Sequence, residues 1–320
     1  MVDPAPILEK PLHSSRYRNC SVARTLDIIS DAWSFLTLRE VFFGVHRFEE
    51  FQSNLEIPRA TLTSRLKRLV AEGILKKVPY SEHGSRYAYH FTRKGIELYP
   101  VMVALLKWGD DWLLREGEDP PLALYHKICG HWTTPQIVCS ECTGLIDARQ
   151  VTHRPGPGAG WDAEVSQQRN RRSSKPSEFR KSRNCSVGRS LSVIGDRWTF
   201  MVMRETFFRV RRYDDFLANL GIATNILSNR LQQLVADGLL RKELYQERPE
   251  RYEYRQTPQG TDLFGAYIVM IAWADKWLSG NEGIPLILTH ETCERDFSAK
   301  VVCGECGGLL NAWDMSGAGF

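Results

Sequence analysis

Residues 19–24 read NCSVAR and residues 184–189 read NCSVGR, so one short stretch recurs 165 positions later in a chain of 320 residues. Self-similarity at a fixed offset marks a duplicated structural unit. Further matches are Trp33 with Trp198, Arg39-Glu40 with Arg204-Glu205, Phe51 with Phe216, Arg86-Tyr87 with Arg251-Tyr252, and Trp112 with Trp277. Beyond these tryptophans one residue is lost and the offset becomes 164. Two copies of one domain therefore fill nearly the whole chain.

Each copy has the periodicity of a small helical domain with a hairpin. Apolar residues at helical spacing predict helices in copy one, with Asp31 capping the second and Gly73 just past the fourth. Two short runs of β character, 74–78 and 87–91, flank a polar tip and predict a hairpin. Thr92 is expected to cap one long final helix. The predicted helices run through Val22–Ile29, Trp33–Phe42, Arg47–Leu55, Leu62–Leu69 and Leu98–Trp112. This is the element order of a winged helix domain.

Several motifs in this order resemble the HxlR family, which belongs with the MarR-like winged helix regulators. They are Cys-x-Val-x-Arg, Leu-Arg-Glu, Arg-Phe-x-x-Phe, Leu-x-x-Arg-Leu and Arg-Tyr-x-Tyr-x-x-Thr, together with the tryptophan of the second helix. The resemblance covers Cys20–Leu113 and Cys185–Leu278. Ser21 and Ser186 depart from it, since the family usually has proline after the cysteine. The resemblance implies a transcriptional regulator with a mainly α fold and short β-hairpin wings.

The chain is expected to hold two winged helix-turn-helix domains, each followed by a small Cys3His segment of the zinc-knuckle or zinc-ribbon type. The linker between the copies has eight Lys or Arg against three acids, a net charge of +5 in a chain whose total is +4. Such a segment weakly indicates an anionic partner and fits a solvated linker equally well. The predicted segments are an N-terminal arm (1–19), the two domains (20–116 and 185–280), the two zinc segments (120–150 and 284–320) and the flexible basic linker (151–184).

An α-helix fits the major groove of double-stranded DNA, and its N-terminal half reaches the base edges. The helix after the turn at 56–58, and its counterpart in copy two, are therefore the predicted recognition helices. Arg47 and Arg212 are expected at phosphates, and Arg86 and Arg251 of the wings at the backbone or the minor groove. The predicted base-reading residues are Arg59, Thr61, Thr63, Ser64 and Arg65, with Lys67 and Arg68 further along, and in copy two Thr224, Asn225, Ser228, Asn229 and Arg230.

The two recognition helices differ, since copy one is richer in cations and copy two in amides. This indicates an asymmetric target, unless copy two serves mainly as a pairing partner. Members of the HxlR family are typically dimers built from the first and last helices. The resemblance thus implies that the two copies pair as an intramolecular pseudo-dimer, which leaves a homodimer with four winged helices as the alternative.

The eight cysteines divide four and four, and in each copy three of them form His-x2-Cys-x9-Cys-x2-Cys. Two short turns that each present two soft ligands are typical of a closed tetrahedral zinc site. We therefore expect two structural zinc ions per chain, one inside each copy; free buried thiols are the alternative. The predicted ligands are His126, Cys129, Cys139 and Cys142 in copy one, and His290, Cys293, Cys303 and Cys306 in copy two.

The remaining cysteines, Cys20 and Cys185, lie at the start of the first helix of each copy. Some relatives sense oxidants or electrophiles with a cysteine here, and a helix N-terminus lowers the pKa of a thiol. A buried packing role is the alternative. The leading prediction is a sequence-specific regulator; a redox- or metal-responsive regulator switched through these thiols or the zinc ligands, and a protein-interaction module without DNA binding, are the others.

An enzyme is not expected. Zinc deaminases pair Cys-x2-Cys with His-x-Glu, whereas Ile128 and Thr292 stand two residues after the histidines here. Four protein ligands also leave no open metal position. No apolar run approaches the ~20 residues that span a bilayer, and the N-terminus has no apolar leader segment. The sequence thus favours a cytoplasmic location and names no small-molecule effector.

Overall fold

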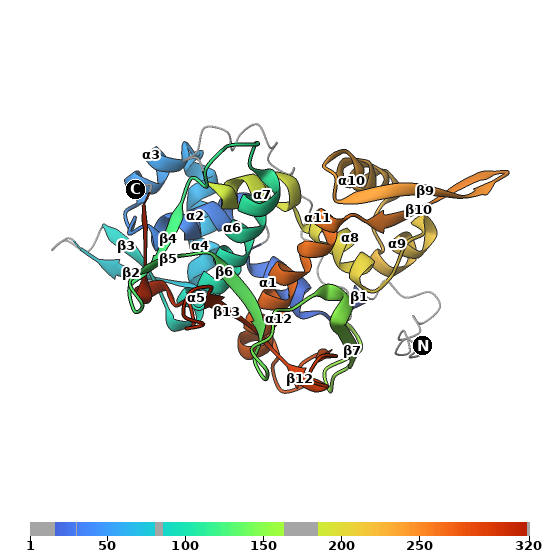
Figure 1. The fold of residues 1–320 in the computed structure, drawn as a ribbon. Coiled ribbons are helices and arrows are strands. Elements are labelled where there is room, and N and C mark those ends of the chain that lie inside the picture. The colour runs from blue at the N-terminus through green and yellow to red at the C-terminus, as the bar shows by residue number, and fades with distance from the viewer. Residues whose placement is uncertain (1–16, 30, 81–85, 163–184, 319–320) are drawn as a thin grey trace. The chain divides into compact units, whose positions relative to one another are not determined.

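The computed structural model describes residues 17–29, 31–80, 86–162 and 185–318 (Figure 1). These residues form two compact units, and each unit contains segments of both copies. Unit 1 takes its described residues from 1–24, 139–173 and 196–299, and unit 2 takes them from 25–138, 174–195 and 300–320. Most of the predicted N-terminal arm, the tip of the first wing (81–85) and most of the predicted linker (163–184) lie outside the described residues.

Unit 2 contains the winged helix of copy one. Leucines at positions 62, 66 and 69 share one helical face and are fully buried, with Phe51 of the preceding helix and Leu36 also without exposed surface. This apolar face orients the recognition helix and leaves its opposite side in solvent. The elements are α2 (Ala32–Phe42), α3 (Phe48–Leu55), α4 (Arg59–Ala71), β2 (Leu75–Pro79), β3 (Tyr87–Phe91), α5 (Arg93–Ile96) and α6 (Tyr99–Leu113).

The predicted helix boundaries in this copy are set by local side chains. Asp31 is the N-cap of α2 and accepts a hydrogen bond from the Ser34 amide, and Thr92 accepts one from the Gly95 amide at the start of α5. Gly73 follows the end of α4 with φ of +66°, the left-handed conformation that glycine adopts without a Cβ penalty. These three predictions are confirmed.

The prediction of one long helix after the wing is wrong. The chain forms α5, turns near Leu98, and then begins α6 at Tyr99. Pro100 lies in the first turn of α6, where its missing N–H is tolerated; inside a continuous helix its ring would clash with the carbonyl of residue 96. The break therefore follows from the proline.

Unit 1 contains the winged helix of copy two with the same element order. Its wing is described through the tip, with a bulge between Arg251 and Tyr252. Asp196 caps α8 as Asp31 caps α2. The elements are α8 (Arg197–Phe207), α9 (Tyr213–Leu220), α10 (Thr224–Ala236), β9 (Leu240–Glu247), β10 (Glu250–Gln256), α11 (Pro258–Asp262) and α12 (Phe264–Leu278).

The first helix of each copy packs on the last helix of the other. In unit 2, α7 (Ser186–Ile194) of copy two lies along α6 of copy one (Figure 1), where a Cβ on Gly109 would stand 2.5 Å from the Ser186 carbonyl oxygen. In unit 1, Ser21 at the start of α1 (Ser21–Ile29) donates to Asp275 of α12, and Arg24 donates to the carbonyl of Leu278 at 3.0 Å. These contacts agree with the predicted pairing of the copies through these helices, and the choice between an internal pair and a homodimer stays a prediction.

The strands after the winged helices are exchanged in the same way. In unit 2, β14 (Met315–Ala318) of copy two pairs antiparallel with β4 (Ala123–His126), which also pairs with β5 (His131–Thr133). In unit 1, β7 (Val151–Pro155) of copy one pairs with β11 (Leu286–His290), beside β12 (Arg295–Phe297). The other elements here are β1 (Tyr17–Arg18), β6 (Pro135–Cys139), η1 (Ala148–Gln150), β8 (Trp161–Asp162), β13 (Ala299–Cys303) and η3 (Ala312–Asp314), with β1 paired to β8 and β6 to β13.

Candidate DNA-binding surface and metal centres

The first recognition helix, α4, exposes the polar side of its N-terminal half. Arg59 and Thr63 are exposed, and Thr61 and Ser64 are half-buried. The Arg59 guanidinium lies over the Phe48 ring at 5.1 Å, which holds a cation beside the first turn. The geometry therefore leaves these four predicted residues available to a groove, with Lys67 exposed and Arg68 half-buried on the next turn.

Arg65 is placed differently from its neighbours. Its Nε lies 2.8 Å from Oδ2 of Asp31, the cap of α2, and only 16% of its side chain is exposed. In copy two, Arg230 makes the same pair with Asp196 at 3.1 Å. A half-buried arginine that ties the recognition helix to the cap of another helix positions that helix. Its predicted contact with bases stays a prediction.

The second recognition helix, α10, presents amides and hydroxyls. Thr224, Asn225 and Asn229 are exposed. Ser228 is within hydrogen-bond distance of the Tyr213 hydroxyl (3.1 Å), and that hydroxyl donates to the Thr224 carbonyl at 2.9 Å. Tyr213 thus joins the start of α9 to the start of α10.

A tyrosine of each wing stacks on the predicted phosphate-binding arginine. The Arg47 guanidinium lies 4.9 Å from the ring centre of Tyr80, and that of Arg212 lies 4.7 Å from the ring centre of Tyr245. Stacking on an aromatic ring orients the plane of the guanidinium and leaves its N–H edge free to donate. No role was predicted for these tyrosines from the sequence, although they stand at equivalent positions just before the wing tip of each copy. Arg86 and Arg251 are exposed on the wings.

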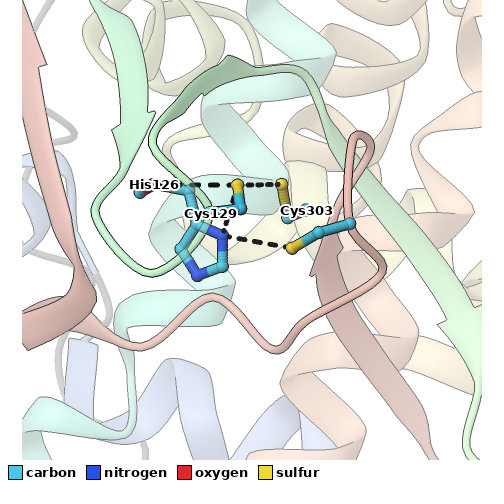
Figure 2. A group of neighbouring side chains, drawn as sticks. His126, Cys129 and Cys303 are labelled. Carbon is cyan, nitrogen blue, oxygen red and sulfur yellow. Dashed lines mark hydrogen bonds between the residues drawn. The ribbon is translucent and has the colours of Figure 1, made fainter.

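The histidine and cysteine pairs form two clusters, and neither cluster lies within one copy. In unit 2, His126 and Cys129 meet Cys303 and Cys306; in unit 1, His290 and Cys293 meet Cys139 and Cys142. Figure 2 shows His126, Cys129 and Cys303 of the first cluster converging. The eight predicted ligands are thus all brought together, but the predicted grouping inside each copy is wrong because the knuckles (Cys-x2-Cys) are exchanged.

The spacing of the donor atoms fits a tetrahedral zinc ion. Zinc–sulfur bonds of about 2.3 Å and zinc–nitrogen bonds of about 2.05 Å place ligand sulfurs about 3.8 Å apart and sulfur and nitrogen about 3.5 Å apart. The Sγ atoms of Cys129 and Cys303 are 3.8 Å apart, and those of Cys139 and Cys293 are 3.9 Å apart. Each histidine Nδ1 lies 3.3–3.6 Å from two sulfurs. Three soft thiolates and one imidazole are a donor set that zinc prefers.

The loop of each Cys-x2-Cys pair has the backbone of a knuckle. The amide of Gly307 donates to the Cys303 carbonyl, and the amide of Gly308 lies 3.4 Å from Cys306 Sγ. Residue 307 has φ of +69°, and the aligned Thr143 has φ of +57°. A Cβ on Gly308 would stand 3.3 Å from His126 Cε1, so the small residue admits the imidazole. In copy one, the threonine thus takes a backbone conformation that suits glycine.

The thiol environments differ within a cluster. Burial acts to raise the pKa of Cys303, but hydrogen bonds from the Thr133 hydroxyl and from the amides of Cys306 and Glu305 outweigh it and lower the pKa to about 6. The Gly144 amide lowers the pKa of Cys142. Burial raises the pKa of Cys129 and Cys293. The knuckle amides thus favour the thiolate, which is the form that binds metal.

Cys20 and Cys185 lie outside the metal clusters. Cys185 is 4% exposed, and its Sγ accepts hydrogen bonds from Arg39 Nη1 at 3.0 Å and from the Gly188 amide at 3.3 Å. Arg39 pairs with buried Glu40, which accepts from Asn54 of α3. In unit 1, Arg204 has a raised pKa: burial lowers it, but Glu205 and Cys20 outweigh that effect. Each thiol is therefore part of a buried polar network.

The arrangement of the described elements is that of two helix-turn-helix domains with wings. The model of HxlR-like helix-turn-helix proteins matches residues 28–117 and 193–282. The chain belongs to the HxlR-like helix-turn-helix family. Together the two matches cover more than half of the chain, so this HxlR-type protein is a tandem, DNA-binding transcriptional regulator.

The following relatives of this HxlR-type chain each align with a stretch no longer than about one copy. The "Uncharacterized HTH-type transcriptional regulator Rv3095" of Mycobacterium tuberculosis is 45% identical over 145 residues, which is 45% of this chain and 91% of that protein. The "Uncharacterized HTH-type transcriptional regulator sll1512" of Synechocystis is 37% identical over 30% of this chain and 73% of that protein. The solved structure of PA1374 from Pseudomonas aeruginosa is 30% identical, covers 38% of this chain and 74% of that one, and has a TM-score of 0.26.

Among the described residues, no helix is both long and apolar enough to cross a membrane.

Proposed function

We propose that α4 and α10 read two unlike half-sites of double-stranded DNA. The observation that carries this proposal is the pair of exposed helix faces, which differ in charge at equivalent positions. Arg59 is replaced by Thr224, Lys67 by Gln232 and Arg68 by Gln233. Cations at phosphates and guanines, against amides at adenines, give the two helices different preferences.

We assign different roles to the residues around the helices. Arg59, Thr61, Thr63 and Ser64, with Thr224, Asn225, Ser228 and Asn229, face the base edges. Arg47 and Arg212 contact phosphates, supported by their stacking on Tyr80 and Tyr245. Arg65 and Arg230 hold the recognition helices against the caps of α2 and α8, which makes them positioning residues. Arg68, Arg86 and Arg251 add charge at the backbone.

A metal ion in each cluster serves the fold in this proposal. Three thiolates and one imidazole fill a tetrahedral coordination sphere, so a zinc ion there has no position for water or substrate. We therefore propose two structural zinc ions per chain and no catalytic activity at these sites. We also propose that the regulator is cytoplasmic. Assembly of two such chains into a homodimer is the alternative to a monomeric chain with one internal pair.

Selection of bound sequences from a random DNA pool tests the asymmetry. The expected result is a site with two different halves, and Asn225→Ala should relax the preference in one half while Arg59→Ala relaxes it in the other. The matched control is Arg93→Ala, which removes an exposed cation from α5. A perfect palindrome, or no enrichment under reducing conditions with zinc present, contradicts the proposal.

A further inference from the structure

Each metal cluster joins residues that are far apart in the chain. One cluster links Cys129 to Cys303 across 174 positions, and the other links Cys139 to Cys293 across 154. In both, the His-x2-Cys pair comes from one copy and the knuckle from the other. A metal bound there is a cross-link between the copies, in addition to the peptide linker.

The strands beside the clusters are exchanged in the same sense. His126 is the last residue of β4, and it lies opposite Met315 of β14. His290 is the last residue of β11, and it lies opposite Val151 of β7. The knuckles therefore sit at the points where the chain of one copy joins a sheet of the other.

The strand pairings between the copies are short. β14 pairs with β4 over four residues and β7 pairs with β11 over five. Both pairings belong to three-stranded sheets whose strands are three to five residues long, so few backbone hydrogen bonds join the copies at these points. The buried Nε2 atoms of His126 and His290 have no hydrogen-bond partner among the described residues, so the imidazoles gain their main polar interaction through Nδ1 at the cluster.

We propose that the two metal ions clasp copy one to copy two, so that metal occupancy sets whether the chain holds its two recognition helices as one DNA-binding pair. This rests on the metal binding proposed above. Closing a loop of more than 150 residues removes many conformations from the opened chain, which is where a metal clip has its largest effect. Losing the metal leaves the linker, the helix pairs and the short strand pairs to hold the second copy near the first.

Cleavage of the linker tests the clasp in the full-length chain. A protease site placed between residues 163 and 184 is cut after purification, and the two fragments are followed by sedimentation and by affinity for the selected DNA site. With zinc bound, the fragments are expected to sediment together. After treatment with a zinc chelator they should separate, DNA affinity should fall about tenfold or more, and added zinc should restore both.

A matched pair of variants makes the test independent of the chelator. Cys129→Ser with Cys139→Ser damages both clusters and should separate the cut fragments. Ser53→Ala, at an exposed residue of α3 outside the clusters and the proposed DNA contacts, keeps every ligand and should leave the fragments together. Separation must occur with the far-UV circular dichroism of the helices retained. Fragments that stay together without metal overturn the clasp but leave the proposed zinc binding intact. Fragments that separate only when the helices unfold also overturn the clasp. Absence of zinc from the intact purified chain overturns the metal binding itself.

Discussion

The Sγ atoms of Cys129 and Cys303 lie 3.8 Å apart, although Cys129 belongs to the first copy and Cys303 to the second. The distance is that of two thiolates on one tetrahedral zinc ion, about 3.8 Å, and is far longer than a disulfide bond of about 2.05 Å. The spacing therefore fits a metal centre shared by the two copies.

The recognition helices should differ in their dependence on salt. α4 has four cations and α10 has one. Arg59→Ala is expected to weaken DNA binding by about 1–3 kcal/mol if it reads a guanine, and to lower the salt slope by about 1 if it contacts a phosphate. Asn225→Ala should weaken binding without changing the slope. Fluorescence anisotropy over a range of salt concentrations measures both, and equal slopes for all variants would contradict this division of roles.

Thr143→Gly should stabilise the metal-bound protein. Thr143 has φ of +57°, where a β-branched residue is strained, and the aligned Gly307 takes φ of +69° without strain. The expected gain is about 1 kcal/mol, reduced somewhat by loss of the hydrogen bond from the Thr143 hydroxyl to the Cys142 carbonyl. The reverse change, Gly307→Ala, should destabilise by a similar amount, since no atom lies within 4 Å of the new Cβ and the cost comes from the backbone alone. Thermal unfolding with zinc present compares the three proteins; a lower Tm for Thr143→Gly would count against this account.

The helix pairs between copies should lose stability as the pH rises from about 4 to 6. Burial raises the pKa of Asp110 and Asp275 to about 6, against the hydrogen bonds from Ser186 and Ser21. The folded state therefore holds protons that the unfolded state has released, and stability falls as these carboxyls ionise. Because both side chains are partly exposed, the loss is on the order of 1 kcal/mol each.

Asp110→Asn removes this penalty. Denaturation at pH 7.5 should show the variant more stable than the wild-type protein, and the difference should shrink toward pH 4. Asp111→Asn is the control, because Asp111 pairs with Lys107 at the surface. Metal loss at low pH affects all three proteins alike, so the differences between them isolate the carboxyl. A constant difference across this range would argue against a raised pKa.

Cys185 is expected to act mainly as a buried acceptor. Cys185→Ala leaves Arg39 without the sulfur and should cost about 1–3 kcal/mol of stability, whereas Cys185→Ser keeps an acceptor and should cost less. Hydrogen peroxide should then weaken DNA binding of the Cys185→Ser variant as much as that of the wild-type protein. A response that vanishes in the serine variant would support redox sensing at this thiol instead.

Features set by neighbouring residues could be predicted from the sequence. The caps at Asp31 and Thr92, the turn at Gly73 and the knuckle turns depend on side chains within a few positions, and the duplication displayed each of them twice. The eight residues of the two candidate metal clusters were predicted for the same reason.

Features that depend on contacts between distant residues could not be predicted from the sequence. The x9 spacing between Cys129 and Cys139 suggested a site inside one copy, but β5 and β6 between them carry the knuckle away, and pairing of β14 with β4 brings a different knuckle to His126. Arg65 has the spacing of a base-reading residue, and only folding shows its ion pair with Asp31. The recurrence of both partners as Arg230 and Asp196 was a signal present in the sequence.

Zinc content of two double variants tests the exchange most directly. Cys129→Ser with Cys303→Ser removes two ligands from one shared cluster, and Cys129→Ser with Cys139→Ser removes one ligand from each. The exchanged arrangement predicts about one zinc ion per chain for the first variant and close to none for the second, against about two for the wild-type protein. The reverse order, with the second variant retaining one zinc and the first losing both, would show that each copy binds its own metal and would contradict the account.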